Sequence, residues 1–201
     1  MKYLAAAALL LLGTTGMATA QEQGEAKPPK PWDTCVSCHG ADGNSVNPIW
    51  PKLAGQGAPY LAKQLHDFKA GRRSDPLMSG MAMAVPDAAV DEVAEYFASQ
   101  EVTPGAPVKP ELVAQGEKLY TAGNLETGVT ACAACHGPAG NGNWPGKYPA
   151  LHAQHAAYTI KQLQMFREGT RANDPNQMMR DVASKLTEQE IEAVAMYLST
   201  L

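Results

Sequence analysis

Aromatic and β-branched side chains are scarce in this sequence, and the scarcity limits the core that it can build. The 201 residues contain 6% aromatic side chains, with three Phe and three Trp, and Val and Ile together number 14. Because strands favour β-branched and aromatic residues, a β-sandwich or barrel is disfavoured and helices should dominate. A chain of this length forms one domain or two, and a small domain with so few large apolar side chains needs a staple or a cofactor.

An excess of positive charge is also missing. The chain has 16 basic and 20 acidic side chains, for a formal net charge of -4. Nucleic-acid binding calls for a clustered basic face, which this balance does not indicate. Nucleic acid is therefore not among the expected partners.

A long apolar run occurs only at the N-terminus. Lys2 is followed by an uninterrupted apolar run over residues 3–12, and small residues precede Gln21. Ten apolar residues are too few for a bilayer core, which needs about 20. The pattern predicts a signal peptide over residues 1–20 that is cleaved after Ala20, so that the mature protein is exported.

Two halves of the sequence repeat each other. The motif at residues 35–40 (CVSCHG) recurs at residues 132–137 (CAACHG), and residues 50–73 match residues 148–171 at 11 of 24 positions. The chain is therefore a tandem duplication. The identities between the halves include Pro51/Pro149, Gln56/Gln154, Tyr60/Tyr158, Gln64/Gln162 and Phe68/Phe166.

The repeat predicts two domains, over residues 21–100 and 111–201. Between them, residues 101–110 hold three prolines and Gly105, which favour an extended linker over a helix. Three prolines in residues 27–32 leave an opening helix of the first domain short or absent. The expected helices span residues 59–70, 87–99, 111–121, 157–168 and 188–199.

Several of these helices carry packing signals. Gly116 would let another helix approach closely, and Thr187 with Glu190 forms a capping box at the start of the last helix. The terminal helices share an i, i+3, i+4, i+7 apolar stripe, which predicts a buried face. Its members are Val90, Val93, Ala94 and Phe97, matched by Ile191, Val194, Ala195 and Leu198.

The four cysteines admit three interpretations. Disulfide or thiol chemistry is one, although a thioredoxin-like pair would need a βαβ context that this strand-poor chain lacks. A zinc site is the second, but each half would hold an incomplete ligand set. The third is c-type haem attachment, for which Cys-x-x-Cys-His is the signature, because two thiols bind the vinyl groups and the histidine binds the iron. This predicts two covalently attached haems, held by Cys35, Cys38, His39, Cys132, Cys135 and His136.

The sixth iron ligand decides between electron transfer and substrate chemistry. Methionine opposite histidine leaves no vacant position on the iron. When the terminal helices are aligned, Met78 pairs with Met179, whereas Met81, Met83 and Met178 have no methionine partner. Met78 and Met179 are therefore the predicted ligands.

Two further pairs are candidates for roles around the haem. The backbone carbonyls of Pro51 and Pro149 are placed to accept a hydrogen bond from the ligating imidazoles and so to orient them. Arg73 and Arg171 match each other, and either contact a haem propionate or have a plain surface role.

With these motifs the sequence resembles the cytochrome c4 family, the dihaem tandem cytochromes c of bacterial periplasms. The resemblance covers nearly all of the mature chain. It implies an all-α fold of two class I cytochrome c domains, each wrapped around one haem, with pseudo-twofold symmetry and haems that face each other. It is carried by both Cys-x-x-Cys-His-Gly motifs, WPKLAGQ (50–56), YPALHAQ (148–154), YTIKQL (158–163), MSGM (78–81) and MRDVASKL (179–186).

The predicted function is electron transfer in the periplasm without substrate chemistry, so the protein is not expected to be an enzyme. The resemblance implies an upstream reductase and a downstream terminal oxidase as partners, and peripheral membrane association in some members. The alternative is a dihaem enzyme such as a peroxidase, or the haem subunit of a dehydrogenase complex.

Overall fold

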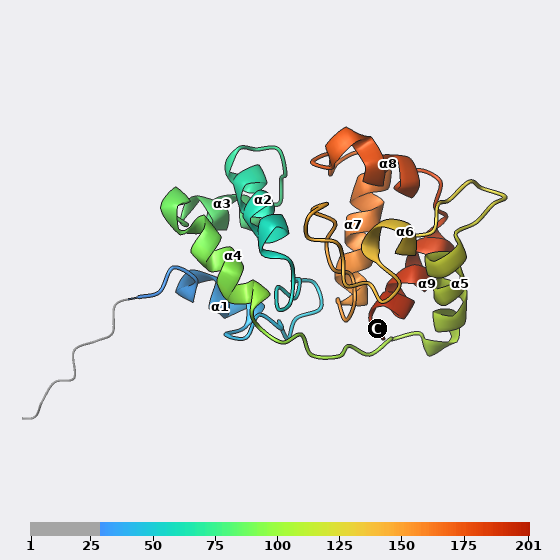
Figure 1. Cartoon of the computed structure of the whole chain (residues 1–201), viewed down its shortest axis with the longest axis horizontal. Helices are drawn as coiled ribbons and strands as arrows, with labels where there is room; N and C mark the ends of the chain where they lie inside the picture. The colour runs from blue at the N-terminus through green and yellow to red at the C-terminus, as the bar shows by residue number, and fades with distance from the viewer. Residues whose placement is uncertain (1–28) are drawn as a thin grey trace, which may run out of the picture.

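The computed structural model describes residues 29–201, which form two helical halves side by side (Figure 1). The predicted signal peptide and its cleavage site lie outside the described residues. Over the described range there are no strands, only two isolated β-bridges. The predicted all-α fold class is confirmed.

Each half contains a short helix that carries the Cys-x-x-Cys-His motif, a long helix, a short methionine-bearing helix and a terminal helix. In the first half these are α1 (Asp33–His39), α2 (Ala58–Lys69), α3 (Met78–Met83) and α4 (Val90–Ala98). In the second half they are α6 (Ala133–His136), α7 (Ala156–Glu168), α8 (Met178–Ala183) and α9 (Glu188–Leu198), preceded by α5 (Val113–Ala122).

The expected helices are observed with small shifts at their ends. The first residues of the 87–99 and 111–121 segments form 3₁₀ turns, Asp87–Ala89 and Pro110–Leu112, before the α-helix begins. Short 3₁₀ turns are frequent at helix N-termini. The capping box predicted for α9 is confirmed, because the Thr187 side chain accepts from the Glu190 backbone N–H and the Glu190 side chain accepts from the Thr187 N–H.

Apolar stripes of the terminal helices form the core of each half. All eight residues of the two predicted stripes are at most 3% exposed. In the first half the stripe packs against Leu61 of α2, and in the second it packs against Leu119 and Tyr120 of α5. The repeat in sequence is therefore a repeat in packing.

The first half lacks a helix equivalent to α5 in its described residues, and an aromatic stack lies there instead. Trp32, just before α1, stacks on Tyr96 of α4 with ring centroids 4.0 Å apart. In the second half, Tyr120 of α5 packs on Tyr197 at 5.5 Å. One indole ring thus covers the face of the terminal helix that α5 covers in the second half.

Gly116 is where α5 and α9 approach each other most tightly. A Cβ atom added to it would lie 2.0 Å from the Ala193 carbonyl oxygen and 2.8 Å from Tyr197 Cβ. We expect Gly116→Ala to lower the free energy of unfolding of the second half by about 3 kcal/mol, because neither backbone can yield without loss of packing. Gly80→Ala is the matched control, since a Cβ there meets no atom within 4 Å. Chemical denaturation measures both variants, and a loss below about 1 kcal/mol for Gly116→Ala would contradict the close approach.

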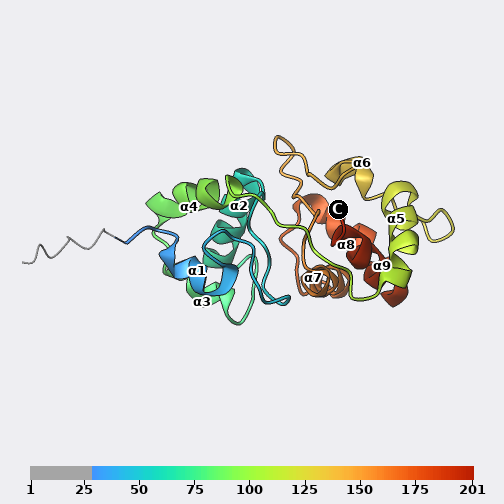
Figure 2. The ribbon, with the colours of Figure 1, turned by 90° about the horizontal axis from the view of Figure 1, so that it is seen from below.

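Helices α2 and α7 flank the boundary between the two halves, and the connecting segment runs along one side of both halves (Figures 1 and 2). Residues 101–109 contain no helix. Hydrogen bonds hold the segment against the first half: Lys52 Nζ donates to the Thr103 carbonyl at 2.6 Å, and Thr103 N donates to Asn44 Oδ1 at 2.8 Å. The segment is therefore fixed to the first half before it reaches the second.

Candidate functional site

The Cys-x-x-Cys-His motifs lie on short helices, as expected for i, i+3 spacing on one helical face. Cys35, Cys38 and His39 are in α1, and Cys135 and His136 end α6. All four thiols are free, so the structure contains none of the disulfides considered above.

The two motifs share a thiol environment. Burial raises the pKa of both Cys35 and Cys132, the first thiol of each motif, to about 11. Across residues 29–201, no group of three or more His, Cys, Asp or Glu side chains is placed to hold a metal ion.

Each motif histidine is buried and oriented by a prolyl carbonyl. The Nδ1 atom of His39 donates to the Pro51 carbonyl at 2.8 Å, and that of His136 donates to the Pro149 carbonyl at 2.9 Å. Burial lowers the pKa of both imidazoles, although the carbonyl bonds oppose the shift. The carbonyl bonds occupy Nδ1 and leave Nε2 of each ring free to act as an electron-pair donor, and the hydrogen bonds predicted to the two prolyl carbonyls are present.

A cavity of about 620 Å³ connects the two motifs. Both histidines and all four cysteines line it, together with Met78, Met81, Met178 and Met179. Met83 does not line the cavity and is 64% exposed. The structure thus brings the predicted ligands Met78 and Met179 to the cavity but also brings Met81 and Met178 there, so the choice by repeat register stays a prediction.

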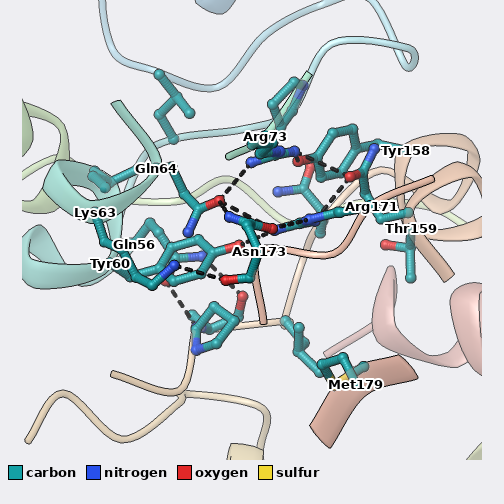
Figure 3. A pocket seen from close by; sticks show the side chains of 18 of the residues that line it. Gln56, Tyr60, Lys63, Gln64, Arg73, Tyr158, Thr159, Arg171, Asn173 and Met179 are labelled. Carbon is teal, nitrogen blue, oxygen red and sulfur yellow. Dashed lines mark hydrogen bonds between the residues drawn. The ribbon is translucent and has the colours of Figure 1, made fainter. Parts of the chain in front are cut away.

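Two arginines occupy the boundary between the halves (Figure 3). Arg73 is 9% exposed and donates to the Tyr158 hydroxyl of the second half at 3.0 Å. Arg171 is 5% exposed and donates to the Tyr60 hydroxyl of the first half at 3.0 Å. The plain surface role considered for this pair is therefore wrong, because each guanidinium is buried by the other half.

Two glutamines join the arginines into one network. Gln64 Oε1 accepts from Arg73 at 2.9 Å and from Arg171 at 3.2 Å. Gln162 Oε1 accepts from Arg171 at 2.8 Å and from Arg73 at 3.0 Å. The contacts are related by the same offset of 98 residues as the sequence repeat, so the network has the pseudo-twofold symmetry that the resemblance implied.

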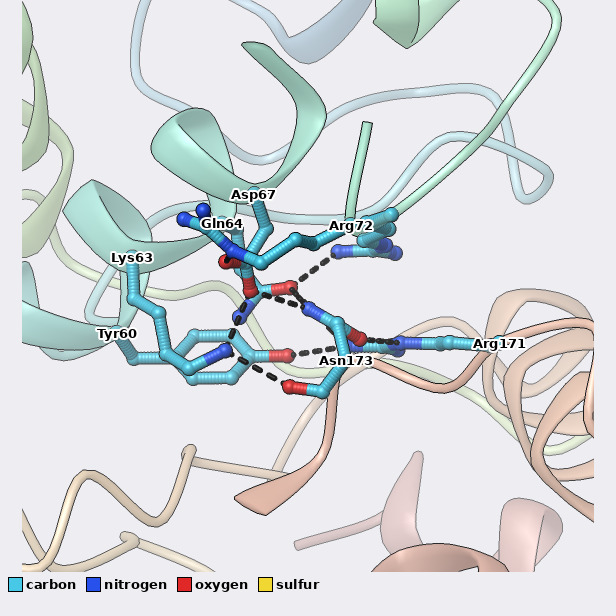
Figure 4. Close-up of polar contacts among 8 residues, drawn as sticks. Tyr60, Lys63, Gln64, Asp67, Arg72, Arg171 and Asn173 are labelled. Carbon is cyan, nitrogen blue, oxygen red and sulfur yellow. Dashed lines mark hydrogen bonds and ion pairs between the residues drawn. The ribbon is translucent and has the colours of Figure 1, made fainter. Parts of the chain in front are cut away.

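One side of this network is not symmetric (Figure 4). Asp67 of α2 accepts from Lys63, from Arg72 at 2.8 Å and from Asn173 of the second half at 2.7 Å. Burial alone would raise the pKa of the Asp67 carboxyl, but these hydrogen bonds outweigh it and hold the pKa below its ordinary value. The repeat places Met165 opposite Asp67, so the second half has no matching carboxylate.

Two other glutamines hold the backbone of the opposite half. Gln56 donates to the Ala150 carbonyl and accepts from the Ala150 N–H, both at 2.9 Å. Gln154 accepts from the Lys52 N–H at 2.9 Å and donates to the Lys52 carbonyl at 3.0 Å. The sequence predicts no role for these glutamines. Their identity between the repeats is the feature that marks both positions as constrained.

These features fit a pair of covalent haems. Each half offers two free thiols and an imidazole at an apolar cavity wall, which includes Leu61 and Phe68 in the first half and Leu163 and Phe166 in the second. The boundary between the halves is positive: burial would raise the pKa of Tyr60, but the charges of Arg171 and Arg73 lower it. Carboxylates such as the haem propionates would be stabilised there.

Known proteins with this arrangement of residues are cytochromes. The Cytochrome c family model matches residues 30–101 and again residues 113–201. Cytochrome c4 of Thiocapsa roseopersicina is 55% identical over 168 residues, which cover 83% of this chain and 86% of the relative. Cytochrome c4 of Pseudomonas aeruginosa is 45% identical over 202 residues and covers all of both chains. The chain belongs to the cytochrome c4 family.

Solved structures agree with this membership. Reduced recombinant cytochrome c4 from Pseudomonas stutzeri superposes with a TM-score of 0.81 at 46% identity, over 85% of this chain and 94% of that chain. Like other cytochromes c4, this is an electron-transfer protein with two covalently bound haem c groups. None of the helices between residues 29 and 201 has the length and apolar character needed to cross a bilayer.

Proposed function

We propose that the protein is a periplasmic carrier that moves electrons between redox proteins and performs no substrate chemistry. Bound haem supplies one-electron redox chemistry. In the first half, His39 and Met78 would ligate the iron. In the second half, His136 and Met179 would do so. The two cysteines of each motif would anchor the haem of that half. The observation that carries the proposal is the single cavity that both motifs and both methionines line.

Rigid positioning of the ligands is what these residues contribute to electron transfer. The prolyl carbonyls fix the imidazole rings, and the short helices α3 and α8 deliver the methionines. Because neither ligand would have to leave the iron, little of the protein would have to rearrange when the iron gains or loses an electron. An N-terminal segment typical of a cleaved signal peptide supports export to the periplasm, where we place the protein.

Carbon monoxide binding tests this proposal. Reduced native protein should bind none, because a histidine and a methionine would both ligate each iron and leave no position for the gas. The measurement is the visible spectrum of the reduced protein with and without the gas. Binding at either haem of the native protein would favour the enzyme alternative.

For the partners, we propose a terminal oxidase as acceptor and an upstream reductase as donor. The thiosulfate dehydrogenase electron acceptor of Stutzerimonas stutzeri A1501 is 38% identical over 201 residues, covering 97% of this chain and 92% of that protein. This likeness favours a dehydrogenase of reduced sulfur compounds as the donor.

A second candidate is a haem subunit within a dehydrogenase complex. A thiosulfate dehydrogenase from Marichromatium purpuratum aligns at 34% identity and a TM-score of 0.76, over 83% of this chain but only 36% of that chain. The native mass of the protein from its own cells separates the two candidates. A free carrier elutes at its own size, whereas a subunit elutes with the dehydrogenase.

A further inference from the structure

One peptide group connects the first histidine to the second half of the molecule. The carbonyl of the Pro51–Lys52 peptide accepts from His39 Nδ1 at 2.8 Å. The N–H of the same peptide group donates to Gln154 Oε1 at 2.9 Å. The peptide group therefore links a side chain of the second half to the histidine of the first.

The second histidine has the mirror arrangement. The carbonyl of the Pro149–Ala150 peptide accepts from His136 Nδ1 at 2.9 Å, and its N–H donates to Gln56 Oε1 at 2.9 Å. Gln56 and Ala150 are no more than 9% exposed, as is Lys52 of the first relay. Gln154 is only partly buried, so the relay through Gln56 is shielded from water more fully than the relay through Gln154.

Hydrogen bonds in such a chain polarise one another. A peptide group whose N–H is already donated is a stronger acceptor at its carbonyl, and low local polarity increases the effect. A stronger acceptor draws the Nδ1 proton and makes the imidazole a more basic ligand. A more basic ligand stabilises the ferric iron and lowers the reduction potential.

We propose that Gln154 and Gln56 are positioning residues that act across the boundary: each lowers the reduction potential of the haem bound by the other half. Gln154 acts on the haem at His39, and Gln56 acts on the haem at His136. The inference rests on the proposed function, because it takes these two histidines as the iron ligands.

The test is a redox titration of the haem-loaded Gln154→Leu and Gln56→Leu proteins, followed by NMR signals of each haem's own axial ligands. Gln154→Leu should raise the ferrous-to-ferric ratio of the first-half haem by up to about twofold at a fixed potential, because one hydrogen bond in a chain strengthens the next by only a fraction of its own energy. The second-half haem should change much less. Gln56→Leu should give the reverse pattern. An effect on the haem of the mutated half, or on both haems equally, overturns the proposal.

A control variant separates the relay from simple loosening of the boundary. His155 Nε2 donates to the Ser45 carbonyl across the boundary at 2.9 Å, and among the described residues its side chain forms no hydrogen bond with the Pro51–Lys52 peptide; its backbone N–H, which donates to Gln154 Oε1 at 3.0 Å, is kept in the alanine variant. His155→Ala should leave the potential of the first-half haem near its native value. An equal rise in His155→Ala and Gln154→Leu would mean that loss of packing causes both, and would reject the relay.

Gln154→Glu keeps an oxygen acceptor for the Lys52 N–H and guards against a folding defect in the leucine variant. In this variant the potential of the first-half haem should not rise, and the His39 ring N–H signal should stay close to its native position. A rise like that of Gln154→Leu would reject the relay. If the native His39 signals lack the shifts of an iron-bound imidazole, the proposed ligand is wrong. If they show those shifts and Gln154→Leu changes nothing, only the relay is wrong.

Discussion

Replacing Cys35 and Cys38 together by serine should leave a protein with one haem and an unfolded first half. The two thiols are the predicted attachment points, and serine cannot form the thioether bonds. The buried apolar cluster of that half is small, with Leu61, Val85 and the stripe of α4 as its members. Without the haem, this cluster cannot offset the entropy of ordering the chain.

Mass spectrometry of the intact mature protein measures the number of haems, and circular dichroism measures the loss of helix. The matched control is the double change of Cys132 and Cys135 to serine, which should remove the other haem and leave the first. A native mass equal to that of the polypeptide alone would refute covalent attachment. Two haems in the Cys35/Cys38 variant would refute the assigned positions.

Replacing Met78 or Met179 by alanine should open one iron and remove half of the methionine-to-iron charge-transfer absorption. Loss of the soft sulfur ligand should also lower the potential of that haem and allow carbon monoxide to bind there. The corresponding changes at Met81 and Met178 are sharp controls, because both side chains line the same cavity. They should leave the absorption band intact.

If the neighbouring methionine, rather than the predicted one, proves necessary for the absorption band, the alignment of the repeats has assigned the wrong ligand. If Met81→Ala loses the band and Met78→Ala keeps it, the first half is misassigned. The same outcome for Met178 and Met179 would apply to the second half. Met83→Ala should leave the absorption band unchanged in either case, because that side chain is exposed.

The helices and the orientation of the histidines could be predicted because their signals are local. Thr187 and Glu190 are three residues apart, the stripes follow the helical period, and Pro51 lies only twelve residues beyond His39. In each case the residues that form the hydrogen bond or the buried face belong to the same half. The repeat then gave a second, independent instance of the stripes and of the histidine–proline contacts.

The boundary between the halves could not be predicted in the same way. Arginine is normally exposed, and nothing near Arg73 in the sequence indicates that a tyrosine 85 residues away would cover it. Identity between repeats marks Gln56 and Gln154 as constrained without saying that each contacts the other half. The prolines predict a short or absent opening helix, but they do not indicate that Trp32 would take its place by stacking on Tyr96.

The paired arginines at the boundary bear on the order in which the molecule is built. Arg73 and Arg171 share the oxygens of two glutamines, and neither forms an ion pair with a carboxylate among the described residues. Two buried like charges repel, so the boundary should be weaker in a chain to which no haem is attached. The propionates of attached haems would supply the negative charge that offsets this repulsion, which predicts that the halves dock more tightly after haem attachment than before it.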